Sequence, residues 1–135
     1  MKWVGLGLVL LLLVVAAGMV WIRLAPDDVA RWHRLPADVS DLDMEGGVMR
    51  LVPGDLADLD RIIRAEPRTY VLAGSVEDGM VTYVTRSKVV GFPDYTTVGQ
   101  RGDNLAVHAR LRYGRSDIGV NKARVERWLA ALRQG

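Results

Sequence analysis

The hydrophobic pattern of this chain begins with a run of twenty uncharged residues, 3–22, that lies between Lys2 and Arg23. At about 1.5 Å of helical rise per residue, the run spans roughly 30 Å, which matches the hydrocarbon core of a bilayer. Trp3 and Trp21 stand at its two ends, where amphipathic indole rings favour the headgroup level. The pattern predicts a transmembrane anchor over residues 1–24.

A cleaved signal peptide is the alternative for this segment. Residues 15–17, Val-Ala-Ala, supply small side chains for cleavage before Gly18. The apolar run nevertheless continues to Ile22, which is long for a signal peptide and favours an uncleaved anchor. A core helix of a soluble protein would need a polar face, and this run has none.

The orientation of the anchor is encoded weakly. Lys2 precedes the run, whereas Arg23, Arg31 and Arg34 come after it, so the Lys/Arg count alone would place the domain in the cytoplasm. A short basic head before an N-terminal apolar segment is also typical of a signal anchor that exports the domain on its C-terminal side. We expect a single-pass protein of the cell membrane with its domain on the exported (periplasmic) side.

The pattern changes after the anchor, where residues 25–47 carry prolines, acidic residues and a Gly46-Gly47 pair, a composition typical of a linker. Three apolar side chains within it could still dock onto a core: Trp32, Leu35 and Leu42. Residues 48–135 have the size of one small domain with one core.

Two helices are predicted in this domain. Residues 48–52 indicate a short edge strand, and a helix over 55–65 comes next, with Asp55 as its N-cap and Pro67 after its end. The apolar residues of this helix recur at helical spacing: Leu56, Leu59, Ile62 and Ile63. A second helix starts at about Asn121, and its apolar stripe is Val125, Trp128, Leu129 and Leu132.

Two hairpins lie between the helices. Residues 69–76 and 80–87 are rich in β-branched and aromatic residues, and the turn 77–79 joins them. Residues 95–100 and 105–112 form the second pair, in which one face of the last strand carries Ala106, His108, Arg110 and Arg112. The alternation predicts that this face is basic and lies in water. The whole order predicts an α+β fold, an antiparallel sheet of about five strands with two helices on one face.

Charge is distributed unevenly, although the whole chain carries a net charge of only +2. Residues 27–60 hold nine acidic residues against three arginines, whereas residues 86–135 hold ten Lys and Arg against four acidic residues. Such a division usually means neutralisation within the fold, and it also allows a basic surface for an anionic partner. Nucleic acid is not expected as a partner, because it needs a denser basic patch with aromatic platforms.

Catalytic chemistry finds little support among the residues. The chain has no cysteine, and His33 and His108 lack further ligands at metal-binding spacing, so we expect no metal site and no cofactor. Ser75, His108 and Asp94 could be drawn as a triad, but Ser75 lacks the context of a nucleophile elbow. Asp94 and Asp117 are explained more simply as acceptors in a turn and at a helix start.

The most suggestive feature is a group of arginines in the basic half: Arg86, Arg110, Arg112, Arg115 and Arg124. Guanidinium groups bind carboxylates and phosphates through paired hydrogen bonds, so arginines gathered on a sheet face could hold an anion. The same arginines could instead tie the sheet, a loop and the last helix together through Arg–Asp pairs. The sequence leaves both interpretations open.

The segments TYVTRSKVVGFPDYTTV and ARLRYGRSDIGVNKARVERWLAAL resemble a widespread family, domain of unknown function 1499, and the likeness covers roughly residues 45–133. The matching residues are Phe92, Asp94, Arg112, Gly114, Ser116, Asp117, Gly119, Asn121 and Arg124. The resemblance implies a membrane- or envelope-associated protein of bacteria or plastids, and it implies no established activity. Many relatives carry a serine where this chain has Leu111, so a site that used that serine is altered here.

Together, these patterns predict a non-enzymatic, membrane-anchored module of the cell envelope that binds an anionic ligand or a lipid headgroup. The expected ligand-binding residues are Arg86, Arg110, Arg112, Arg115, Ser116, Asp117, Asn121 and Arg124. A protein–protein interaction module is the second hypothesis, based on the acidic and basic halves. The third is an enzyme of unknown class that uses Asp94, Ser116 or Asp117 with the arginines.

Overall fold

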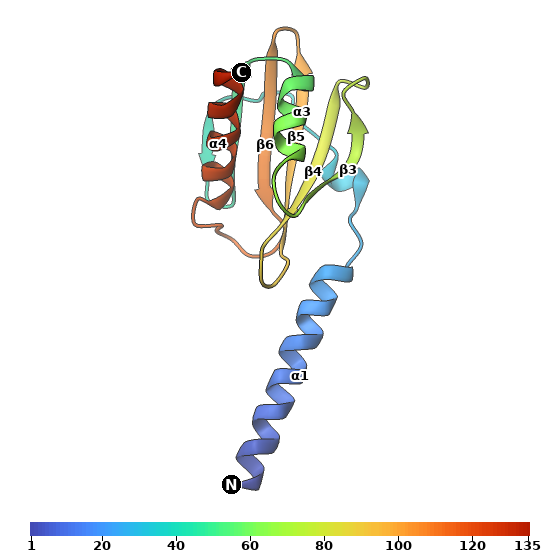
Figure 1. Ribbon diagram of the computed structural model, residues 1–135, viewed down its shortest axis with the longest axis vertical. Helices are drawn as coiled ribbons and strands as arrows, with labels where there is room; N and C mark the ends of the chain where they lie inside the picture. The colour runs from blue at the N-terminus through green and yellow to red at the C-terminus, as the bar shows by residue number, and fades with distance from the viewer.

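The apolar run forms one continuous helix, α1 (Lys2–Leu24), which projects from the rest of the molecule in the computed structural model (Figure 1). The structure describes all residues, 1–135. None of the α1 residues is buried, and the mean hydropathy of its most apolar stretch is 2.6. By length and composition α1 can cross a membrane; a signal sequence near an N-terminus meets the same criterion.

The domain is built on one antiparallel sheet in the order β1-β2-β6-β5-β4-β3, which confirms the predicted α+β fold. The sheet has six strands rather than the predicted five. The strands are β1 (Leu42–Met44), β2 (Gly47–Pro53), β3 (Thr69–Ser75), β4 (Met80–Arg86), β5 (Pro93–Arg101) and β6 (Asn104–Leu111). The additional strand is β1, which pairs with β2 around the Glu45–Gly46 turn, so β2 is not the edge strand that its sequence suggests.

Two helices cover one face of the sheet, as predicted (Figure 1). In α3 (Leu56–Arg64), the Asp55 carboxylate accepts a hydrogen bond from the Ala57 amide and caps the helix. The other helix is α4 (Val120–Gln134). The main core lies between these helices and the sheet, and its largest buried members are Leu59, Ile63, Tyr83, Leu105, Val107 and Leu129.

The opposite face lies under residues 25–41, which we call the strap and which contain the short helix α2 (Val29–Trp32). The Trp32 ring stacks on Tyr95 with ring centroids 4.0 Å apart, and Val39 packs against Met49 and Ala106. Residues 25–47, which the sequence predicts as a linker, therefore include α2, β1 and part of the packing on the sheet.

The prediction that the outer face of residues 105–112 lies in water is wrong. Ala106 is fully buried, and His108 and Arg110 are only partly accessible, because the strap covers them. Period-2 alternation shows which residues share a face, but it does not show whether a distant segment covers the polar one.

Candidate anion-binding site at the base of the domain

The structure divides the predicted group of arginines among three places. Arg124 lies on the side of the sheet that carries the helices, where it pairs with Asp94. Arg86, Arg110 and Arg112 contact the strap or the end of α1 on the opposite side. Arg115 lies exposed in the loop after β6, and it forms no ion pair. The predicted set therefore does not form one site.

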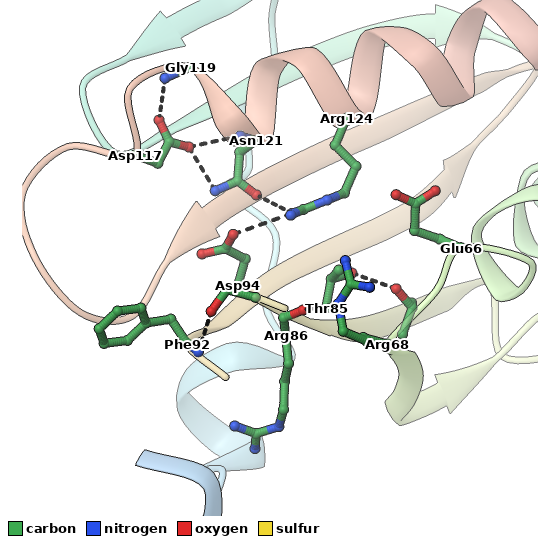
Figure 2. Close-up of polar contacts among 12 residues, drawn as sticks. Glu66, Arg68, Thr85, Arg86, Phe92, Asp94, Asp117, Gly119, Asn121 and Arg124 are labelled. Atoms are coloured by element: carbon green, nitrogen blue, oxygen red, sulfur yellow. Dashed lines mark hydrogen bonds and ion pairs between the residues drawn. The ribbon is translucent and has the colours of Figure 1, made fainter. Parts of the chain in front are cut away.

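A chain of polar contacts runs from the start of α4 to β5 (Figure 2). The carboxylate of Asp117 accepts hydrogen bonds from the Gly119 amide at 2.9 Å, from the Asn121 amide at 2.9 Å and from Asn121 Nδ2 at 2.8 Å. Arg124 Nη1 then donates to Asn121 Oδ1 and Asp94 Oδ2, each at 3.3 Å. Burial raises the pKa of the Asp94 carboxyl, and the facing Arg124 guanidinium opposes that shift.

These contacts join the start of α4 to β5. Asp117 caps α4, the fully buried Asn121 links the cap to Arg124, and Arg124 ties the helix to β5. Ser116 accepts a hydrogen bond from the Ile118 amide at 3.2 Å and otherwise faces solvent. The contacts of Asp117, Asn121 and Arg124 are those of a structural network, as the second sequence interpretation describes.

Arg110 and Arg112 hold the strap. Arg110 donates hydrogen bonds to the Trp32 carbonyl and, at 2.9 Å, to Thr97 Oγ1, and burial lowers its pKa to about 10. Arg112 donates to the Pro26 carbonyl at 3.1 Å and to the Tyr95 hydroxyl at 3.1 Å, and it pairs with Asp27 at 3.4 Å. These contacts occupy both guanidinium groups with strap or sheet atoms.

Arg86 leads to a different place. Its Nη1 donates to the Gly91 carbonyl at 3.0 Å and to the Ile22 carbonyl in the last turn of α1 at 3.3 Å. Its Nη2 reaches the Tyr70 hydroxyl at 3.2 Å. Figure 2 shows the Arg86 guanidinium pointing away from Arg124 and towards the N-terminal segment. A carbonyl at a helix C-terminus has no partner within the helix, so Arg86 satisfies an acceptor that α1 leaves open.

Arg86 lines a hollow of about 290 Å³ at the end of the domain where α1 joins, which we call the basal pocket. The pocket is lined by Arg23, Arg68, Thr69, Tyr70, Arg86, Ser87, Lys88 and Gly91. Four of these side chains are cationic and none is acidic. None of the four cations forms an ion pair with a carboxylate.

Backbone carbonyls hold the arginines of the basal pocket in place and leave N–H groups free. Arg23 donates to the Val89 carbonyl at 2.6 Å and to the Val90 carbonyl at 3.2 Å, while Arg68 Nε donates to the Arg86 carbonyl at 2.9 Å. Both terminal nitrogens of Arg68 and the whole Lys88 ammonium make no hydrogen bond within the chain. Donors of this kind in one place suit an anion, above all a phosphate.

Sequence reasoning missed Arg68 and Lys88 and used Arg23 only for topology. Arg68 comes beside Arg86 because β3 carries a bulge at Leu72, which shifts the β3–β4 register by one residue. The Arg86 amide then donates to the Arg68 carbonyl at 2.9 Å. The predicted hairpin already brings residues 68 and 86–88 to one end of the sheet, and that proximity was the signal that could have identified the pocket.

Other hollows carry weaker chemistry. A larger one of about 430 Å³ is lined by only two arginines, Arg34 and Arg101, and Arg101 donates its terminal nitrogens to the Pro36 and Ala37 carbonyls. No three His, Asp or Glu side chains gather where they could hold a metal ion. The basal pocket gathers four cations, more than any other hollow of the molecule, and is the strongest candidate site.

The family model "Protein of unknown function (DUF1499)" matches residues 37–132, about seven tenths of the chain. The match includes the whole sheet, α3, α4 as far as residue 132 and three of the four pocket cations, whereas α1 and most of the strap precede it. No curated protein and no solved structure matches the chain. The sequence resemblance is thus confirmed, and the chain belongs to the DUF1499 family of proteins of unknown function.

Proposed function

We propose that this chain is a non-enzymatic, membrane-anchored domain that binds the phosphate of anionic lipid headgroups in the basal pocket. The observation that carries the proposal is the position of four cations without carboxylate partners at the C-terminal end of the one helix that can cross a membrane. Juxtamembrane cations attract anionic lipid by about 1 kcal/mol each.

The location of the pocket supports a headgroup as the ligand. Arg23 comes directly after the apolar run and Trp21 lies two residues before it, so in a spanning α1 both lie at the headgroup level. Arg23 and Arg86 join α1 to the domain at that level through the carbonyls of Val89 and Ile22. A weak phosphate site held there meets a high local concentration of headgroups.

The two halves of opposite charge give less support to a protein-binding module. Arg112 from the basic half pairs with Asp27 from the acidic half, and Lys122 pairs with Asp43 at 2.6 Å. Arg50, an arginine of the acidic half, pairs with Glu126 of the basic half at 2.8 Å. Part of the charge division is therefore used within the fold, as expected for neutralisation.

The test uses the full chain in neutral detergent micelles, titrated with short-chain phosphatidylglycerol and, separately, with short-chain phosphatidylcholine. We expect tighter binding of phosphatidylglycerol, and we expect Lys88→Gln and Arg68→Gln each to weaken it about fivefold, since each removes about 1 kcal/mol of attraction. Lys88 is the cleaner position, because it makes no hydrogen bond within the chain that the substitution would remove.

Arg133→Gln is the matched control, since this exposed arginine lies in the last turn of α4, at the far end of the domain from α1 (Figure 1). Equal binding of the two lipids, or an equal loss in Arg133→Gln, would overturn the proposal. Inorganic phosphate is the third arm: competition by phosphate alone at low concentration would identify a free phosphate, rather than a lipid, as the ligand.

The anchor and its orientation are part of the proposal. Intact mass of the membrane-extracted chain distinguishes an uncleaved α1 from a signal peptide removed before Gly18, and either product retains Arg23 and the whole pocket. The exported orientation is tested with Asp78→Cys in the exposed β3–β4 turn. Because the chain has no native cysteine, labelling by a membrane-impermeant maleimide in intact cells would report this position alone.

A further inference from the structure

Two loops at the base of the domain carry apolar side chains that are exposed to solvent. Val89 in the β4–β5 loop is 71% exposed, and Ile118 in the β6–α4 loop is 93% exposed. Phe92 and Val120 are also exposed, and the Phe92 ring contacts Tyr113 with centroids 6.1 Å apart, so the two loops meet. We call Val89, Phe92, Tyr113, Ile118 and Val120 the apolar rim.

Ile118 is unusual in its backbone as well as its exposure. Its φ is 55°, in the left-handed region that β-branched residues rarely adopt. An isoleucine in this conformation is strained, and its side chain gains no contact within the chain that would offset the strain. The fold of the isolated chain therefore gives no reason for an apolar side chain at this position.

The position of the rim relative to α1 identifies what could cover it. Figure 1 shows both loops at the end of the domain that faces α1. The Arg23 side chain in the last turn of α1 donates to the carbonyls of Val89 and Val90, which fixes the β4–β5 loop beside the end of the helix. Gly91, at φ 87°, leaves the space that Arg23 occupies, since a Cβ there would lie 3.0 Å from Arg23 Cγ.

Basic side chains surround the rim, and the two carboxylates beside it, Asp94 and Asp117, are bound by Arg124 and by the start of α4. Lys88 and Arg115 flank the exposed apolar residues, and the basal pocket adds Arg23, Arg68 and Arg86. Interfacial segments place apolar side chains at the headgroup–acyl boundary and basic side chains among the headgroups. The base of this domain carries both kinds of side chain, exposed apolar residues and basic residues.

We infer that the apolar rim docks into the headgroup–acyl boundary of the bilayer that α1 crosses, as a second membrane contact beside the helix. The inference rests on the anchoring of α1 in the proposed function, but not on headgroup binding. Docking holds the domain against the membrane and keeps the basal pocket at the level of the phosphates. It depends on apolar contact, so it should occur on neutral lipid.

The test uses the full chain, in which single cysteines can be introduced without removing native ones. An environment-sensitive fluorophore is attached at Val89→Cys, at Ile118→Cys, at Met19→Cys within α1, and at Asp78→Cys in the β3–β4 turn. Each variant is reconstituted into phosphatidylcholine vesicles with and without nitroxide-labelled lipid. We expect blue-shifted emission and nitroxide quenching at positions 89 and 118, as at position 19, and neither effect at position 78.

Quenching at position 19 with water-exposed emission at both 89 and 118 would overturn the docking and leave the anchor intact. The absence of quenching at position 19 would overturn the anchor, and with it both proposals. The fluorophore is itself apolar and could insert into the bilayer on its own. A second measurement therefore combines the Ile118→Cys probe with Val89→Asn, which replaces an apolar side chain by an uncharged polar one. Quenching should fall in that variant and stay unchanged with Leu51→Asn, the matched change at an exposed apolar residue of β2; equal quenching in the two variants would also overturn the docking.

Discussion

The two faces of the sheet differ in what covers them. One face packs against α3 and α4 through a continuous apolar core. The opposite face lies under the strap, and two small apolar clusters there flank a group of polar contacts. In that group, Thr97 Oγ1 contacts Thr82 Oγ1 at 2.8 Å, and Thr82 in turn contacts His33 at 2.8 Å, while Arg110 donates to Thr97.

The two faces of the sheet have different structural roles. The helix face gives the domain its core, because apolar burial is the main favourable term in folding. The strap face joins the domain to α1 through Arg112, Asp27, Tyr70 and Arg86, so α1 and the sheet are held in one arrangement. Every fully buried polar side-chain atom has a hydrogen-bond partner.

The largest effect should come from Trp32→Ala, which removes the ring stacked on Tyr95. If the strap is part of the fold, the loss should be about 4 kcal/mol in the free energy of unfolding, as for a large aromatic residue in a core. Urea denaturation of the full chain in micelles measures it, with the exposed neighbour Arg34→Ala as the control, expected within about 0.5 kcal/mol of wild type. A decrease of less than about 1 kcal/mol in the free energy of unfolding of Trp32→Ala would show that the strap contributes little to the stability of the domain.

The helix face and its supports were predictable from the sequence, because they depend on local signals. Asp55, Pro67 and the spacing of Leu56, Leu59 and Ile63 suffice to define α3. The strap face was not predictable, because no local pattern shows that Trp32 reaches Tyr95, sixty-three residues later in the chain. A segment without regular secondary structure is positioned by long-range contacts rather than by a periodic pattern of apolar residues.

The candidate site shows the same division. The Arg124–Asp94 pair is of the kind that the sequence offers, an Arg–Asp tie between the sheet and the last helix, but the sequence does not name its two members. The basal pocket depends on the bulge at Leu72 and on the return of the 87–92 loop to Arg23, and neither has a sequence signature of its own. The pocket could therefore be expected as a basic region, but its members could not be named.

A second prediction uses pH to separate the faces, because His108 lies on the strap side. Burial, and secondarily Arg110, lowers its pKa to about 4 from the 6.5 of an unburied histidine. Between about pH 4 and pH 6.5 this histidine is protonated in the unfolded chain and neutral in the folded domain, so protonation favours unfolding. The free energy of unfolding is therefore undiminished above pH 6.5 and decreases as the pH falls to about 4.

Allowing for the partial exposure of His108, we expect a loss of about 2 kcal/mol over that interval. Denaturant titrations at a series of pH values measure it as the difference between wild type and His108→Gln, which cancels the titration of the carboxylates. Parallel curves for the two proteins would show that His108 titrates in the folded domain as it does in water.

A matched pair of tyrosines gives a finer comparison. Tyr83 donates to Asp60 at 2.6 Å on the helix face, and Tyr95 donates to Asp27 on the strap face. Each hydroxyl binds a carboxylate, so each Tyr→Phe change should lose about 1.5 kcal/mol. Hydrogen exchange should locate the effects differently: faster exchange in α3 for Tyr83→Phe, and in the strap and the last turn of α1 for Tyr95→Phe. Faster exchange of the strap in both variants would mean that the faces open together.

The smallest expected effect concerns the base of the domain, where the two roles meet. Ile118→Gly removes a left-handed strain of about 1–2 kcal/mol, and the greater freedom of glycine in the unfolded chain offsets part of the gain. In micelles we expect the variant to be more stable than wild type by about 0.5 kcal/mol. Val89→Gly, at an exposed position without positive φ, should give no such gain.

The same Ile118→Gly change should weaken docking in phosphatidylcholine vesicles, measured as less nitroxide quenching of a probe at Val89→Cys. A substitution that stabilises the chain and weakens its membrane contact would identify Ile118 as a residue whose role lies outside the fold. If Ile118→Gly destabilises the domain, its side chain has a structural role despite its exposure, and the strain at position 118 has no bearing on the membrane. If stability increases and quenching is unchanged, neither folding nor membrane contact would account for the strain at Ile118. The apolar rim would then be limited to Val89 and its neighbours in the β4–β5 loop.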